Sequence, residues 1–245
     1  MNAVVVLVEP AGPLNIGSVA RLCANFSVSA LRLVSPRCDS SATEAIRMAV
    51  HGRDVLSQAQ VFSSLIDAIN DCSRTVATCG RLDHGDIPLH SPESALGWLI
   101  DRPDEQEGGA EPLALVFGRE DRGLSNSELR LCQRVLSLHS SETYPSLNLS
   151  HAVGIVLHEL RRLQLLDDKP GRCSPDPAPA QDMDDCLNDA EDLLLEAGFL
   201  LEHTAAARMG KVRDLLQRAT TRREEVALLR GMVRQLRWAI RTERS

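Results

Sequence analysis

The stretch AVVVLVEPAGPLNIGSVAR occupies residues 3–21 and contains the features that decide the fold. Its first six residues, Ala3 to Val8, are continuously apolar, which is typical of a strand buried on both faces of a sheet. After Gly12, apolar side chains recur at the three- and four-residue steps of a helix, at Val19, Leu22, Cys23 and Phe26. A buried strand followed directly by an amphipathic helix predicts a parallel α/β sheet.

Further short apolar runs support this fold class, and helical stretches lie between them. The longest predicted helix runs from about Leu149 to Leu166 and carries apolar side chains along one face. We therefore predict a largely parallel α/β domain over residues 1–166. Its remaining strands are expected at Leu31 to Val34, Arg74 to Thr78, Leu113 to Phe117 and Val135 to Leu138.

The composition changes after this long helix. Residues 167–182 are rich in proline and polar side chains, which is typical of a semi-rigid linker. Beyond the linker, the pattern predicts helices at roughly 183–197, 204–219 and 222–242. We therefore predict a small all-helical extension over residues 183–245.

The net charge of −7 is unevenly distributed along the chain. From His203 to Ser245 there are 11 Lys and Arg against 4 Asp and Glu, so positive charge gathers at the C-terminal end. In the last helix, an apolar stripe contains Val226, Leu229, Val233, Leu236 and Ile240, and a second stripe contains Arg230, Arg234, Arg237 and Arg241. The arginine stripe is our candidate for binding RNA phosphates; the alternative is a solvated face whose arginine stems cover apolar surface.

Several classes of protein are disfavoured by what the sequence lacks. The 7 cysteines contain no Cys-x-x-Cys pair, and an odd number fits free thiols better than a disulfide framework. His158-Glu159 has no second histidine at the spacing of a zinc-binding helix, so no metal is expected. The run Ala3 to Val8 is too short for a signal peptide or a membrane span. We therefore expect a soluble, cytoplasmic protein with no membrane partner.

The residues after the first strand form the first candidate site. Backbone N–H groups at the predicted start of the helix can bind an anion, and Gly17 allows a close approach. Arg21 lies about 200° around the helix from Val19 and Cys23, so it should point away from the apolar stripe. Taken alone, Arg21 could equally be an ordinary surface arginine.

Two further segments place polar residues at strand or helix ends. Phe117-Gly118-Arg119-Glu120-Asp121-Arg122-Gly123-Leu124 follows a predicted strand, where such a loop can bind a ligand or simply form a polar turn. Ser146-Leu147-Asn148 precedes the long helix. Ser146 and Asn148 could cap that helix, or the free N–H groups there could bind a small ligand.

Taken in order, these segments resemble the three motifs of the SpoU (TrmH) branch of the SPOUT RNA 2′-O-methyltransferases. The first is Asn15 with Arg21, the second is Gly118-x-Glu120-x-x-Gly123-Leu124, and the third is Ser146-Leu147-Asn148. The resemblance covers roughly residues 3–166. The proline-rich linker and helical extension further resemble the TrmJ type, which methylates the ribose of nucleotide 32 in tRNA anticodon loops.

The resemblance implies a C-terminal trefoil knot in the sheet domain, an S-adenosyl-L-methionine cofactor, a tRNA substrate and a homodimer. The dimer contact would involve the helices at Asn15 to Phe26 and Leu149 to Leu166, with Arg21 approaching the partner's cofactor. A guanidinium stays protonated in proteins, so Arg21 is expected to stabilise developing alkoxide charge rather than accept a proton. The other implied catalytic residues are Asn15, Glu120, Ser146 and Asn148, and the implied cofactor-binding residues are Thr78, Cys79, Gly80, Gly118, Leu138, Pro145, Ser146 and Leu147.

Two segments depart from the family pattern. Thr78-Cys79-Gly80-Arg81 replaces a small Ser-Ala pair, which makes Cys79 a candidate reactive thiol, and His139-Ser140-Ser141 replaces a more apolar lead into the third motif. Two alternatives remain for the function: an enzyme of the same branch that acts on another tRNA or rRNA ribose, or a catalytically silent RNA-binding protein with the same knot. The absence of a Gly-x-Ser-x-Gly elbow disfavours a small-molecule hydrolase.

Overall fold

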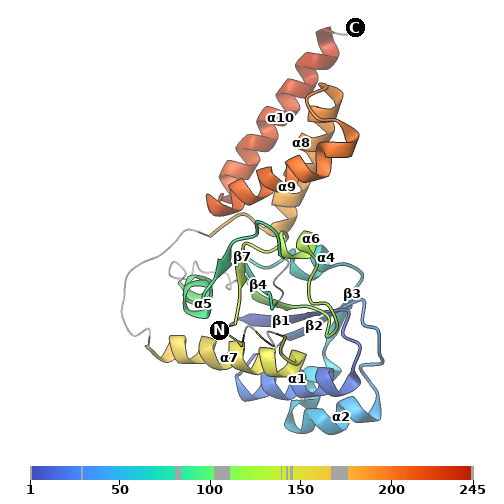
Figure 1. Cartoon of the computed structure of the whole chain (residues 1–245), viewed down its shortest axis with the longest axis vertical. Coiled ribbons are helices and arrows are strands. Elements are labelled where there is room, and N and C mark those ends of the chain that lie inside the picture. The colour runs from blue at the N-terminus through green and yellow to red at the C-terminus, as the bar shows by residue number, and fades with distance from the viewer. Residues whose placement is uncertain are drawn as a thin grey trace.

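A parallel sheet forms the centre of the first part of the chain (Figure 1). The computed structural model describes residues 2–28, 30–80, 84–101, 111–138, 140–141, 143, 146–166 and 176–243. Within these residues, seven strands pair in the order β3-β2-β1-β6-β4-β7-β5, and every named pairing is parallel. The strands are β1 (Ala3–Val8), β2 (Ala30–Val34), β3 (Gln60–Phe62), β4 (Arg74–Thr78), β5 (Leu89–His90), β6 (Leu113–Phe117) and β7 (Arg134–Leu136).

The predicted fold class is confirmed, because each of the five predicted strands is present. The prediction for the last of them was too long, since β7 ends at Leu136 rather than Leu138. The sequence did not reveal β3 and β5, which lie at the two edges of the sheet and are only 3 and 2 residues long. Their side chains are exposed or only partly buried, so neither edge strand carries a continuous apolar run.

Helices cover both faces of the sheet, which explains why the central strands β1 and β6 are apolar throughout. On β1, Val5 belongs to the core cluster on one face, whereas Val6 belongs to the cluster on the other. The first face is covered by α1 (Pro13–Asn25), α2 (Thr43–Ala49), α3 (Arg53–Ser57), α5 (Pro92–Ile100) and α7 (Leu149–Leu166). The second face is covered by α4 (Leu65–Ile69) and α6 (Asn126–Leu129).

The C-terminal part is helical, as predicted, and packs around a third apolar cluster. It contains α8 (Ala180–Glu196), α9 (Glu202–Arg218) and α10 (Arg223–Glu243). The predicted linker over 167–182 was too long, since α8 begins at Ala180, directly after the proline-rich segment. Residues 167–175 lie outside the described residues. The described end of the linker is packed rather than free, because Ala180 belongs to the core on the second face of the sheet.

The segment that precedes α8 contacts the first domain near the amino ends of β4 and β7. Arg74, the first residue of β4, is fully buried and pairs with Asp176 at 2.9 Å. Gln133, one residue before β7, donates to the carbonyl of Ala178 at 3.4 Å. The segment that leads into α8 therefore packs at the amino ends of these strands, whereas parallel sheets bind ligands at the carboxyl ends.

Two sequence-based expectations concern features of the whole chain. The trefoil knot stays a prediction, because residues 139, 142, 144 and 145 lie outside the described part of the sheet domain. None of the helices in the described ranges has the length and apolar character needed to cross a bilayer.

Candidate active site

The start of α1 binds a carboxylate from a distant part of the chain. The main-chain N–H of Ala11 donates to Oε2 of Glu120 at 3.1 Å, and that of Gly12 donates to Oε1 at 3.2 Å. Asn15 also donates to Oε1, through its Nδ2, at 3.1 Å. A helix start favours negative charge, and the sequence predicted an anion site here. The structure fills that site with the protein's own Glu120, which ties the second motif to the first.

The close approach predicted at Gly17 is made by a helix rather than by a ligand. A Cβ atom at Gly17 would lie 2.2 Å from the carbonyl oxygen of Ala45 on α2. A Cβ atom at Gly52 would likewise lie 2.4 Å from the carbonyl oxygen of Ala20 on α1. These two glycines therefore allow α1 to pack closely against the chain that follows β2.

Asn148 joins the third motif to the other two. Its Nδ2 donates to Oδ1 of Asn15 at 3.2 Å, so Glu120, Asn15 and Asn148 form one hydrogen-bonded chain. Its Oδ1 accepts from the main-chain N–H groups of Ser150 at 2.9 Å and His151 at 3.3 Å, at the start of α7. Asn148 thus caps the long helix and also contacts the first motif, so the two interpretations of this residue are compatible.

A cavity of about 330 Å³ lies beside this chain, at the carboxyl ends of β4, β6 and β7. Its size falls in the range of about 300–1,000 Å³ typical of small-molecule sites. Glu120 lines it, and so do Leu149 and Ala152 of α7. The predicted cofactor-binding residues that line it are Thr78, Cys79, Gly80, Gly118, Leu138, Ser146 and Leu147, whereas Pro145 lies outside the described residues.

The walls of this cavity fit a nucleoside better than a metal ion. Leu138 and Leu147 offer apolar surface, and the glycines expose main-chain groups that can read a base. At Gly118 the chain turns so tightly that a Cβ atom would lie 2.3 Å from the main chain of Gly123. Among the described residues, no group of His, Cys, Asp or Glu side chains is arranged to hold a metal.

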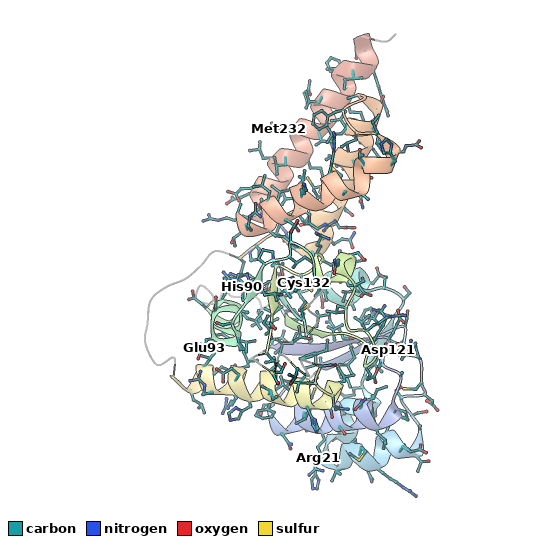
Figure 2. All side chains as sticks on the ribbon, in the orientation of Figure 1. Arg21, His90, Glu93, Asp121, Cys132 and Met232 are labelled. Carbon is teal, nitrogen blue, oxygen red and sulfur yellow. The ribbon has the colours of Figure 1, made fainter. Side chains whose placement is uncertain are left out.

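Arg21 lies on the exposed side of α1, as its position on the helix predicted. Figure 2 shows it at the end of the first domain away from the C-terminal helices. It lines a second, open hollow of about 690 Å³ between α1 and α7, and Leu147 borders both this hollow and the cavity. Within the described ranges, the side chain of Arg21 makes no hydrogen bond or ion pair. A single protomer therefore does not bring Arg21 into contact with Glu120, Asn15 or Asn148.

Arg119, to which the sequence pattern assigned no role, lies largely buried between two glutamates. Its Nη1 and Nη2 each lie 2.9 Å from the carboxylate of Glu128, and Nη2 also contacts Glu9. The hydrogen bond from Arg119 lowers the pKa of Glu9. Burial alone would raise the pKa of Glu128, but hydrogen bonds from Arg119 and Ser125 hold it below its usual value. The visible signal was the pair Ser125 and Glu128, which forms a capping box at α6.

The four arginines predicted to bind RNA differ in their surroundings. Arg230 pairs with Asp189 at 2.7 Å, Arg237 donates to the carbonyl of Asp189 at 2.6 Å, and Arg241 lies 3.3 Å from Glu196. These contacts hold α10 against α8. Arg234 is exposed, and within the described residues it has no hydrogen bond or ion pair.

The charge of the C-terminal helices also differs from the expectation. Residues 180–245 contain 11 Lys and Arg against 12 Asp and Glu, because α8 is rich in acidic side chains. The predicted excess of positive charge holds for the residues from His203 onward, but not for the three C-terminal helices together. Leu236, predicted in the apolar stripe of the last helix, is 55% exposed. The outer side of α10 also carries Met232 (Figure 2).

The ordered motifs, the parallel sheet and the cavity define a class of RNA methyltransferase. Residues 2–158 match the family model described as "SpoU rRNA Methylase family", and the chain therefore belongs to that family. The similarity extends to the C-terminal helices, since the model "tRNA methyltransferase TrmJ, C-terminal domain" matches residues 181–245. The resemblance noted from the three motifs is thereby confirmed.

Individual relatives cover both parts of the chain. The tRNA (cytidine/uridine-2′-O-)-methyltransferase TrmJ of Salmonella typhimurium is 33% identical over 237 residues, which is 95% of this chain and 95% of that protein. The crystal structure of TrmJ from Z. mobilis ZM4 is 28% identical with a TM-score of 0.80, covering 96% of this chain and 98% of that one. A probable methylase family protein from Haemophilus influenzae Rd KW20 is 27% identical with a TM-score of 0.61, covering 99% and 98%.

Proposed function

We propose that this protein transfers a methyl group from S-adenosyl-L-methionine to a ribose 2′-hydroxyl of tRNA, at nucleotide 32 of the anticodon loop. The observation that carries the proposal is the pair of hydrogen bonds that links Glu120 to Asn15 and Asn15 to Asn148, because it joins three separate family motifs beside one cavity. The activity named for TrmJ of Salmonella typhimurium supports cytidine and uridine in tRNA as acceptors. Such an enzyme would work in the cytoplasm.

The cofactor would occupy the cavity at the carboxyl ends of β4, β6 and β7. Its sulfonium supplies an electrophilic methyl group, so the protein must align that group with the ribose oxygen. Main-chain groups at Gly80, Gly118 and Leu138 would bind the nucleoside, and Ser146 and Leu147 would close the wall beside α7. Pro145, which lies outside the described residues, is proposed as a further cofactor-binding residue.

Arg21 would act as a fixed positive charge near the ribose oxygen. A guanidinium keeps its proton at any pH where the protein is folded, so charge stabilisation suits it better than proton abstraction. Glu120 and Asn15 would fix the start of α1 and thereby the direction in which Arg21 projects.

We propose a homodimer, in which Arg21 approaches the cavity of the partner subunit. The open hollow between α1 and α7 supports this arrangement, because it carries Arg21 together with exposed apolar side chains. Met48 is 38% exposed and Ile155 is 46% exposed there. Symmetric pairing of α1 and α7 would cover both side chains and place Arg21 at the contact.

Ribose methylation mapped across total RNA, from cells with and without this protein, tests the proposal. Loss of the mark at tRNA nucleotide 32 is the expected result. Loss of a mark at another ribose would move the substrate within the same reaction class. If no mark changes, and the purified protein does not methylate tRNA with S-adenosyl-L-methionine, the proposed activity is wrong and the silent RNA-binding alternative is supported.

A further inference from the structure

Arg119 occupies an unspecified position within the second motif and borders the cavity, and its side chain pairs with Glu9 and Glu128 and contacts Gly123 of the loop that carries Glu120. We infer that Arg119 is a positioning residue for methyl transfer: it holds the loop Gly118–Leu124 in the geometry that seats Glu120 on the start of α1. This inference rests on the proposed function and deepens it.

The contacts of Arg119 join three elements. Its side chain is only 9% exposed. It forms a two-point pair with Glu128 of α6, contacts Glu9 at the end of β1, and donates from Nη1 to the carbonyl of Gly123 at 3.2 Å. Paired, planar contacts of this kind are a property of guanidinium that an ammonium group cannot reproduce.

A main-chain hydrogen bond between Arg119 and Gly123 closes the loop Gly118–Leu124. The N–H of Gly123 donates to the carbonyl of Arg119 at 3.0 Å, and Gly123 adopts a φ of +68°, which favours glycine. Glu120 follows Arg119 directly, and its carboxylate accepts from Ala11, Gly12 and Asn15. Because the loop is short and Arg119 ties it to β1 and α6, any shift of Arg119 moves Glu120 relative to α1.

The charges in this region make Arg119 hard to replace. Glu9 and Glu128 both contact its guanidinium, so both carboxylates lose their main cation if Arg119 is removed. Arg122 cannot take its place, because it is 62% exposed and reaches Glu9 only at 3.4 Å. Repulsion between the two carboxylates would then separate the end of β1 from α6 and open the loop.

The test compares Arg119→Lys and Arg119→Met with a matched control, Arg32→Met. Arg32 is also buried and forms a two-point pair, with Asp71 at 2.6 and 2.7 Å, but it lies on β2 away from the cavity. We expect kcat on tRNA to fall about 10- to 100-fold in both Arg119 variants, because small misplacements near reacting groups cost this much. The control should lose thermal stability and keep kcat within about 2-fold, since its pair touches no site residue. Arg119→Lys keeps the positive charge, so the test can still be made if Arg119→Met does not fold.

Combining each Arg119 variant with Glu120→Gln separates positioning from general loss of structure. If Arg119 acts through Glu120, the second substitution should add little to the loss in kcat caused by the first. Losses that multiply would overturn the inference, and so would wild-type kcat in Arg119→Lys.

Amide hydrogen exchange provides a measurement that does not depend on activity. The N–H groups of Ala11 and Gly12 donate to Glu120, so both should exchange faster in Arg119→Lys and stay unchanged in Arg32→Met. Unchanged exchange at both positions would overturn the inference. If wild-type protein does not methylate tRNA, the proposed function fails, whereas the exchange measurement still decides whether Arg119 positions Glu120.

Discussion

Gln217 on α9 donates a hydrogen bond through Nε2 to the main-chain carbonyl of Cys132 at 3.0 Å, and the same amide donates to the carbonyl of Arg130. The Arg130 side chain in turn lies 3.1 Å from Asp214, one turn earlier on α9. These contacts fasten the C-terminal helices to the chain that leaves α6. Because α6 also carries Glu128, the partner of Arg119, the joint lies next to the second motif.

Replacing Gln217 with Leu should destabilise this joint by about 1–3 kcal/mol, because two partly buried carbonyls lose their donor. Urea unfolding would measure the loss. Gln235→Leu is the control, since Gln235 is exposed on α10 and, within the described residues, its side chain forms no hydrogen bond. Equal stability of the two variants would show that the amide of Gln217 does not hold the joint.

The exposed side of α9 should bind tRNA more strongly than the paired arginines of α10. Arg208, Lys211 and Arg218 are exposed at helical spacing, and within the described residues none has an acidic partner. Lys211→Glu and Arg218→Glu should each weaken tRNA binding and reduce the slope of log Kd against log salt concentration by about one.

Arg230→Met is the control for these charge reversals, because Arg230 pairs with Asp185 and Asp189. It should lower the melting temperature of the C-terminal helices and leave the salt slope nearly unchanged. If Arg230→Met changes the slope of log Kd against log salt concentration more than Lys211→Glu does, α10 rather than α9 contacts the RNA.

The sequence predicted the buried strands and the motif residues, but not the edge strands or the contacts between distant segments. Strands such as β1 and β6 were predictable because burial on both faces leaves a continuous apolar pattern. The edge strands β3 and β5 are exposed or only partly buried and leave no such pattern. The motifs located Glu120 and Asn148. That Glu120 binds the start of α1, 108 positions away from Gly12, depends on the sheet order and leaves no local signal. The pairing of α10 with α8 was missed for the same reason.

The contacts of Arg119 predict a pH dependence of stability. Burial favours the neutral form of Glu128, but the hydrogen bonds from Arg119 and Ser125 outweigh it and hold the pKa below the usual 4.5. A carboxylate with a lower pKa in the folded state stabilises the fold above its unfolded pKa, and this contribution is lost as the pH falls. In Glu128→Gln, the free energy of unfolding should therefore fall less steeply below about pH 4.5 than in wild type.

Urea titrations from pH 7 to pH 3 would measure this difference. Glu93→Gln is the control, because the Glu93 side chain is 69% exposed and its contact with Arg162 is 3.5 Å long. The free energy of unfolding of Glu93→Gln should depend on pH as in wild type. If it changes as little with pH as that of Glu128→Gln, the contact between Arg119 and Glu128 makes no specific contribution to the loss of stability at low pH.

Arg21→Ala should lose methyl transfer by a factor of about 100 or more, as expected when a charge that stabilises a developing oxyanion is removed. Stability and the affinity for S-adenosyl-L-methionine should stay nearly the same, because Arg21 is exposed and, within the described residues, its side chain makes no hydrogen bond or ion pair. Arg53→Ala on α3 removes another exposed arginine and should keep full activity. Substantial turnover by Arg21→Ala would remove Arg21 from the mechanism.

Asn15→Asp should damage the site while leaving the shape of the side chain almost unchanged. Asn15 donates to Glu120 at 3.1 Å and accepts from Asn148 at 3.2 Å, so aspartate loses the donor and faces Glu120 with a second negative charge. The lost charged hydrogen bond is worth about 1.5–3 kcal/mol, which corresponds to a fall in kcat/KM of roughly 10- to 100-fold near pH 8.

Two carboxylates in contact share a proton as the pH falls, because repulsion raises the pKa of one of them. The Asn15→Asp variant should therefore recover part of its relative activity between pH 8 and about pH 5, since the shared proton restores the lost donor. Asn70→Asp, at an exposed position after α4, should follow the wild-type pH profile. A constant ratio of Asn15→Asp to wild-type activity over this range would show that the contact between Asn15 and Glu120 does not control the reaction.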